Sequence, residues 1–148
     1  MYKSIRHFVL GGSVTIASIL AIAVTSGAAT ANTYQNVATG FCLDSNANGQ
    51  AYTLGCNGGS YQKWNVSSVG STVIFKNLAT GFCLDSNANG QAYTLGCNGG
   101  SYQKWSVRTV GSARIFKNLA TGFCLDSNTN GQVYTLGCNG GSYQKWQR

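Results

Sequence analysis

The acidic side chains are the rarest chemical groups in this sequence and the most regularly spaced. The 148 residues include three Asp and no Glu, and Asp44, Asp85 and Asp126 follow one another at intervals of 41 residues. A carboxylate accepts hydrogen bonds from two adjacent hydroxyl groups, which suits the binding of a sugar. Glycoside hydrolysis requires two carboxyl groups in one site, and the stretch around each Asp has only one. We therefore expect binding and not an enzyme.

Amide, phenol and apolar side chains follow each Asp at fixed distances. An amide both donates and accepts hydrogen bonds, and an aromatic ring covers the apolar C–H face of a pyranose. The structural alternative is that Asp44 closes a turn over the next two residues, but the whole set is more typical of a sugar site. The predicted carbohydrate-binding residues are Asp44, Tyr52, Leu54, Asn57 and Tyr61, then Asp85, Tyr93, Leu95, Asn98 and Tyr102, then Asp126, Tyr134, Leu136, Asn139 and Tyr143.

Because the sequence has a single histidine, most catalytic and metal sites are excluded. His7 is the only imidazole, and it lies near the N-terminus in what resembles an export signal. The rest of the chain therefore has no His to activate a nucleophile and no His to bind a metal ion. A zinc site made of thiolates is also disfavoured, because the six cysteines do not form close pairs in sequence. We expect no catalytic residues, no metal and no cofactor.

These residues lie within a repeated unit. Residues 79–105 repeat residues 38–64 without a change, and residues 120–146 differ only by Thr129 and Val133. The 41-residue period divides the chain into repeats 32–72, 73–113 and 114–148, which together make one predicted domain, 32–148.

Short strands between Gly and Asn turns are the elements expected to position the site. In the second repeat we expect strands at about 73–77, 82–85, 91–95 and 102–107. Twelve strands in three equivalent sets predict an all-β fold with pseudo-threefold symmetry. A β-propeller also uses four strands per unit, but it needs about four blades to close. We therefore predict a β-trefoil.

Two cysteines in each unit add a constraint. The symmetric pairing schemes are within units or between each unit and the next. We favour one disulfide within each repeat, because it joins the second strand to the third across one loop. A closed loop of about 15 residues contributes roughly 3 kcal/mol in the chain-entropy model. The predicted bridges are Cys42–Cys56, Cys83–Cys97 and Cys124–Cys138.

The alternation of side chains along strands predicts which groups share a face. Asp44 and Tyr52 are expected on the face of the disulfide. Trp64, with its equivalents, is expected in the core together with Phe41 and Leu43. Gln62 is expected to have a structural role through bonds to the backbone.

The N-terminal segment predicts export. Lys3 and Arg6 precede an apolar stretch at residues 14–24, and residues 29–31 match a small-x-small cleavage pattern. We expect residues 1–31 to be a signal peptide and the product to be secreted and extracellular, without membrane insertion. Eight Lys and Arg against three Asp remain beyond residue 31, and the lysines are spread over the units, so nucleic acid is not an expected partner.

The Cys-Leu-Asp and Gln-Lys-Trp segments of each unit resemble the QxW motif of ricin-type β-trefoil lectins over the whole region beyond the signal. The sequences LDSNxNGxxYTL and NGGxYQKW are most similar to the actinohivin-like members. That resemblance implies recognition of high-mannose glycans through terminal α1,2-linked mannose, with one pocket per unit. Two features differ from the actinohivin-like pattern: Gly55, Gly96 and Gly137 stand where Pro is expected, and every unit has a full cysteine pair.

The expected product is thus a secreted, trivalent lectin, a monomer with three sites, whose partners are glycans or glycoproteins. Galactose-binding ricin-type lectins carry an aromatic platform at the position where this chain has Leu54. The resemblance therefore does not favour galactose as the ligand. The alternatives are a binding module for xylan or galactosides and a trefoil protein inhibitor. Inhibitors act through one distinctive loop, whereas these loops repeat almost without variation.

Overall fold

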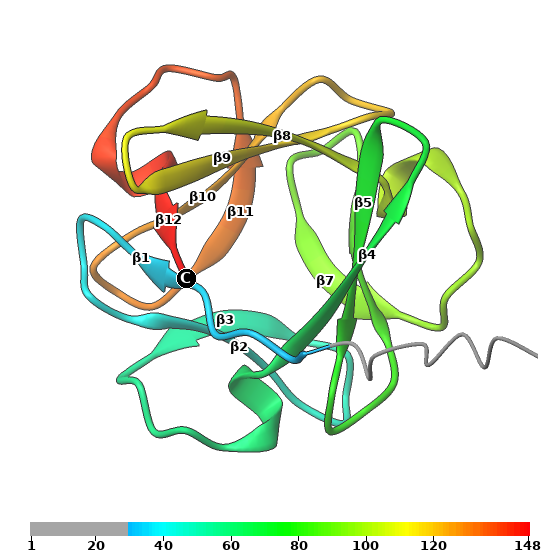
Figure 1. Ribbon diagram of the computed structural model, residues 1–148, viewed down its shortest axis with the longest axis horizontal. Helices are drawn as coiled ribbons and strands as arrows, with labels where there is room; N and C mark the ends of the chain where they lie inside the picture. The colour runs from blue at the N-terminus through cyan, green and yellow to red at the C-terminus, as the bar shows by residue number, and fades with distance from the viewer. Residues whose placement is uncertain (1–29) are drawn as a thin grey trace, which may run out of the picture.

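The computed structural model describes residues 30–148, so the predicted signal peptide lies outside the described residues except for its last two positions. Within that range the chain forms twelve β-strands, three short 3-10 turns and no α-helix (Figure 1). The strands are β1 Gln35–Asn36, β2 Cys42–Ser45, β3 Ala51–Leu54, β4 Trp64–Val69, β5 Thr72–Asn77, β6 Cys83–Ser86, β7 Ala92–Leu95, β8 Trp105–Val110, β9 Ala113–Asn118, β10 Cys124–Ser127, β11 Val133–Leu136 and β12 Trp146–Gln147.

Six of the strands form a closed barrel. The antiparallel pairs run from β1 to β12, then to β9, β8, β5 and β4. Asn32, just before β1, forms a bridge with Trp64 at the start of β4 and so closes the ring. The first and last strands of the fold are therefore neighbours, and Gln35 pairs with Gln147.

The remaining strands form three hairpins, β2–β3, β6–β7 and β10–β11. Figure 1 shows the three units as similar lobes around a central axis. Bridges from the residue before one third strand to the next third strand, such as Gln50 with Tyr93 and Gln91 with Tyr134, join the hairpins at that axis. This arrangement confirms the predicted all-β trefoil of three repeats.

The core is built largely from equivalent positions of the three units. Trp64, Trp105 and Trp146 are fully buried, and each indole N–H donates to the backbone oxygen of a buried Leu. Three aromatic rings pack edge to face, with centroids 4.8–5.5 Å apart. They belong to Tyr34, Phe75 and Phe116.

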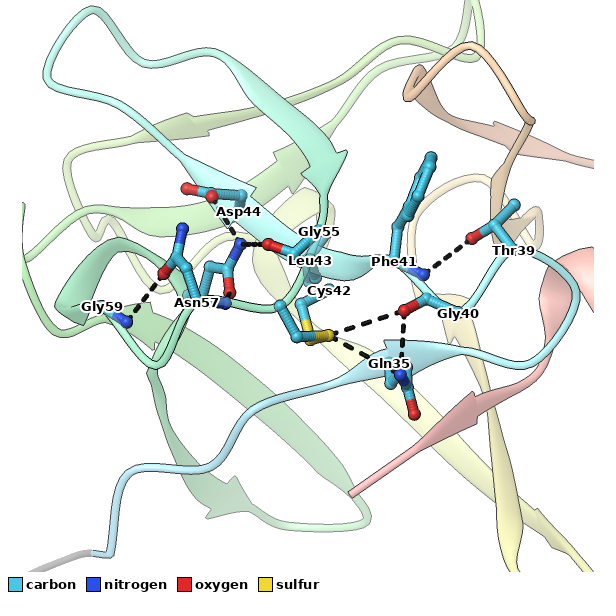
Figure 2. The surroundings of a disulfide bond; sticks show 12 residues. Gln35, Thr39, Gly40, Phe41, Cys42, Leu43, Asp44, Gly55, Asn57 and Gly59 are labelled. Carbon is cyan, nitrogen blue, oxygen red and sulfur yellow. Dashed lines mark hydrogen bonds between the residues drawn. A yellow bond between two sulfur atoms is a disulfide. The ribbon is translucent and has the colours of Figure 1, made fainter.

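Two sequence predictions about the core and the strands were wrong in detail. Phe41 is only partly buried and is not part of the core. Its backbone belongs to a turn, since Phe41 N donates to Thr39 Oγ1 and Phe41 O accepts from Asn36 N. Figure 2 shows its ring directed away from the disulfide.

The fourth strand of each unit begins later than predicted. In the second unit β8 starts at Trp105, and the preceding residues Ser101–Gln103 form a 3-10 turn. Gln103 N donates to Gly100 O within this turn. Gln103 is buried and Tyr102 is exposed, as the alternation of these residues with Trp105 predicts, but a 3-10 turn and not a strand places them so.

Each predicted disulfide is present within its own unit. The pairs are Cys42–Cys56, Cys83–Cys97 and Cys124–Cys138, each with a Cα–Cα separation of 5.0 Å. Each bridge ties the start of the second strand to the loop after the third. That loop carries the predicted site residue Asn57 or its equivalent (Figure 2).

Candidate functional site

The second and third strands of each unit place an acid and a phenol side by side. Asp44 on β2 lies directly opposite Tyr52 on β3, so both side chains share a face. Asp44 is 3% exposed, and the Tyr52 hydroxyl donates to Ser45 O at 3.2 Å. The phenol is thereby fixed next to the carboxylate.

A buried glutamine holds the carboxylate from behind. Gln62 is fully buried, and its Nε2 donates to Asp44 Oδ2 at 2.9 Å and to Gly55 O at 3.0 Å. Its Oε1 accepts from Asn57 N at 2.9 Å. Gln103 and Gln144 make the same bonds in their units. The bonds to Gly55 O and Asn57 N confirm the structural role expected for Gln62, whereas its bond to Asp44 was not predicted, although the two residues recur 18 positions apart in every unit.

In the first unit this arrangement leaves the second carboxylate oxygen without a hydrogen-bond partner within residues 30–148 of the protein. Among the described residues, Asp44 Oδ1 is buried and has no hydrogen-bond partner. Burial of an unpaired carboxylate oxygen is unfavourable. A hydroxyl group of a ligand would satisfy it.

The rim of the site is formed by exposed side chains. Leu54 is 50% exposed at the end of β3, and Tyr61 is 44% exposed on the 3-10 turn. Asn57 is also exposed, and its Oδ1 accepts from Gly59 N at 2.8 Å, which orients the amide (Figure 2). A buried acid, an amide, an apolar edge and two phenols therefore gather at each unit.

In the second unit the five predicted residues together line one hollow, and the five predicted residues of the third unit line another. The hollow of the second unit has a volume of about 650 Å³, and that of the third about 430 Å³. Both are within the roughly 300–1,000 Å³ typical of ligand sites. The Ser and Asn that follow each Asp were not among the predicted site residues, but they also line the hollows, as Ser86, Asn87, Ser127 and Asn128. The first unit repeats the hydrogen bonds that build the other two.

Each site is completed by a residue of a neighbouring unit. Asn77 on β5 is 1% exposed, and its Nδ2 donates to Tyr61 O at 2.7 Å. Asn118 holds Tyr102 in the same way, and Asn36 holds Tyr143. The three bonds form a cycle around the molecule, and sequence analysis had no signal for them, because Asn at a turn is ordinarily a local capping residue.

The tyrosines beside the acids are held in the protonated form. Burial raises the pKa of Tyr52, and the negative charge of Asp44 adds to the effect. Tyr93 and Tyr134 have raised pKa values for the same reasons, with Asp85 and Asp126 as their neighbours. These phenols therefore remain hydrogen-bond donors over the whole neutral range.

Within residues 30–148 there is no group of three His, Cys, Asp or Glu side chains that could hold a metal ion. In the same range, no helix is long and apolar enough to cross a membrane.

The sequence profile of the ricin-type beta-trefoil lectin domain matches residues 30–146. The chain belongs to this family. Ricin-type lectin domains bind carbohydrates. The match covers the whole described region apart from its last two residues.

Solved structures share the trefoil fold of this lectin domain. A designed threefold symmetric protein, ThreeFoil, is 23% identical with a TM-score of 0.73, over 78% of this chain and 94% of that one. SeviL bound to asialo-GM1 saccharide is 16% identical with a TM-score of 0.69, over 81% and 96%. An exo-β-1,3-galactanase from Clostridium thermocellum is 21% identical with a TM-score of 0.75, but only 30% of that chain is covered, against 82% of this one. At these identities the likeness establishes the fold.

Proposed function

We propose that this chain is a non-enzymatic, trivalent lectin that binds terminal α1,2-linked mannose of high-mannose glycans. The observation that carries the proposal is that every unit sets one carboxylate beside exposed phenol, amide and apolar groups, and in the first unit Asp44 Oδ1 is buried without a partner among the described residues. Two hydroxyl groups of a hexose can donate to this acid while Tyr61 covers a C–H face. Each hollow offers one carboxylate, which suits binding and not glycoside hydrolysis.

The choice of mannose rests on the resemblance of the repeated motif to actinohivin-like lectins. The rim position of Leu54 supports it, because a galactose-binding ricin-type site would carry an aromatic platform there. Leu54, Leu95 and Leu136 are each about half exposed, so an aliphatic edge faces the ligand in every unit.

Three equivalent sites would raise the avidity of the protein for glycans. One shallow site binds weakly, but three sites on one rigid body raise avidity by roughly 10² to 10⁴ on a clustered glycan. We propose that the protein acts as a secreted monomer on glycans or glycoproteins outside the cell, after removal of residues 1–31.

The test is calorimetric titration of oxidised residues 32–148 with α1,2-mannobiose, with galactose and xylobiose as comparisons. We expect mannobiose to bind at least at three sites per chain, one in each unit. Binding of galactose or xylobiose alone would keep a lectin and reject the mannose assignment. No binding of any of the three would reject the lectin and favour a protein inhibitor.

The matched variant is Asp44→Asn with Asp85→Asn and Asp126→Asn. The new amide must direct its oxygen toward Gln62 Nε2 to keep the 2.9 Å bond, so its NH₂ group replaces the acceptor that faces the ligand. We expect a folded protein whose affinity falls at least tenfold, since a hydrogen bond to a charged group contributes about 1.5–3 kcal/mol. Unchanged affinity would show that these acids do not contact the sugar.

A further inference from the structure

A separate hollow lies on the threefold axis, where the hairpins of the three units meet. Thr53 N donates to Gly131 O at 2.8 Å, and the equivalent bonds Thr94 N to Gly49 O and Thr135 N to Gly90 O have the same length. The three bonds form a closed ring. The hollow beside it has a volume of about 660 Å³, well within the roughly 300–1,000 Å³ of ligand sites.

Glycine keeps this ring closed. Gly49 has a φ of +80°, and a Cβ there would lie 2.8 Å from Thr94 O. Gly90 and Gly131 are restricted in the same way. Side chains are therefore excluded from these positions, and the wall of the axial hollow includes bare backbone.

The side chains that line the axial hollow are uncharged. They include the amides of Gln50, Gln91 and Gln132 and the rings of Tyr52, Tyr93 and Tyr134. Amides that donate and accept, together with aromatic rings, suit a neutral polyhydroxyl ligand, and no charged side chain of the described residues lines the hollow to pair with an ion. We propose that the axial hollow is a fourth saccharide site, present once per molecule.

The axial site and the unit sites share walls but not all of their residues. Tyr93 lines both the axial hollow and that of the second unit, and Tyr134 does the same in the third. By contrast, Tyr102 and Tyr143 line only the unit hollows, and the three Gln line only the axial one. Variants can therefore separate the two kinds of site.

The third unit makes the axial hollow asymmetric. Val133 lines it where the other units have Ala51 and Ala92, and this is one of the two positions at which residues 120–146 differ from the other repeats. A ligand on the axis thus meets one larger apolar wall. Valine is tolerated in this position of the fold, which supplies a conservative way to narrow the hollow.

The inference rests on the proposed function for the class of ligand, and its test keeps the two apart. An NMR titration of ¹⁵N-labelled protein uses α1,2-mannobiose, methyl β-galactoside and xylobiose and follows backbone amides. With at least one of these saccharides we expect Gly49, Gly90 and Gly131 to shift and saturate at a concentration different from the amides beside Tyr61, Tyr102 and Tyr143.

Two variants assign the axial response. Gln50→Glu, Gln91→Glu and Gln132→Glu together keep the oxygen that accepts from Asn46, Asn87 or Asn128 at 2.7 Å, but they replace the donor amides with charges. We expect at least a tenfold weaker axial response and unchanged unit sites. Ala51→Val with Ala92→Val, which only narrows the hollow, should weaken the axial response as well.

The reciprocal variant is Tyr61→Ala with Tyr102→Ala and Tyr143→Ala, which removes the exposed rims of the unit sites. Persistence of the axial shifts in this variant supports a separate site. If the axial shifts disappear together with the unit shifts, they are relayed through the shared tyrosines and the axial site is rejected. Unit shifts without axial shifts in the unmodified protein reject the axial site alone, and the absence of any shift rejects both proposals.

Discussion

Tyr52, Tyr93 and Tyr134 combine a structural bond with a place in two candidate sites. Each hydroxyl donates to the backbone oxygen of a Ser in its own unit, and each ring lies next to an Asp. The phenol group must stay protonated for this bond to persist. The raised pKa of each of the three side chains supports that state.

The protonated tyrosines predict how stability depends on pH. In the unfolded chain a Tyr loses its proton near pH 10.0, while the folded protein retains it to higher pH. The stabilising contribution is therefore complete below about pH 10 and is lost as the pH rises through the folded pKa. Urea unfolding between pH 8 and 11 should show falling stability above pH 10. In the triple variant Tyr52→Phe, Tyr93→Phe and Tyr134→Phe the decline should be shallower, and identical slopes would contradict this origin.

At this scale the sequence predicts which residues gather but not how they are bonded. The single Asp per unit, with amide and phenol groups at fixed spacing, was enough to predict a common surface. The bond from Gln62 to Asp44 was not predictable, because strand alternation gives a face and not a hydrogen-bond partner. It depends on a 3-10 turn whose signal, Asn-Gly-Gly-Ser, also fits an ordinary hairpin loop.

At the scale of elements, each 3-10 turn is held by the strand that follows in the barrel. Asn77 at the end of β5 bonds to Tyr61 O, while its Oδ1 also accepts from Ala79 N at 3.1 Å and Thr80 N at 3.2 Å. The same side chain therefore shapes a turn in its own unit and positions a residue of the previous one.

Replacement of Asn77 is expected to damage the site of the first unit and not that of the second. Asn77→Ala leaves Tyr61 O without its buried donor, at a cost of about 1–3 kcal/mol, and frees the turn that carries Tyr61. We expect at least a tenfold loss of affinity at the first site in a site-resolved NMR titration with mannobiose.

Asn77→Asp is the matched control, because it keeps the acceptor for Ala79 and Thr80 but cannot donate to Tyr61 O. It should weaken the first site as Asn77→Ala does. If only the second site is affected, the residue acts locally and the contact between units has no role in binding.

The strands themselves were predictable because turn residues mark their ends. Positive φ at Gly70 and Gly111, with a non-glycine residue after each, is the pattern of a tight hairpin turn between paired strands. The predicted start of the fourth strand was wrong because Tyr-Gln-Lys-Trp alternates like a strand. Its first two residues instead complete the turn.

At the scale of the whole molecule, the threefold repetition predicts a sharp dependence on the number of working sites. Tyr102→Ala with Tyr143→Ala leaves the first site intact, so its affinity for soluble mannobiose should equal that of one site in the unmodified protein. Binding to a surface dense in high-mannose glycan should fall by roughly 10² to 10⁴, because simultaneous engagement is lost.

The measurement compares calorimetry on the disaccharide with surface binding on the dense glycan. Tyr102→Phe with Tyr143→Phe is the control, since the rings remain, and it should keep most of the avidity. Equal losses in the two assays would indicate that the sites act one at a time and that their spacing does not match the glycan.

The near identity of the units also has a consequence for refolding. Residues 38–64 and 79–105 have the same sequence, and each accepts the same bond from an Asn of the next unit. A unit of one chain therefore fits equally well into the place of a unit in another chain. Because β1 and β12 close the barrel by pairing the two ends of the fold, a second chain can supply that closing strand as well. Segment exchange between chains competes with closure within one chain, so the yield of monomer should fall as the protein concentration during refolding rises.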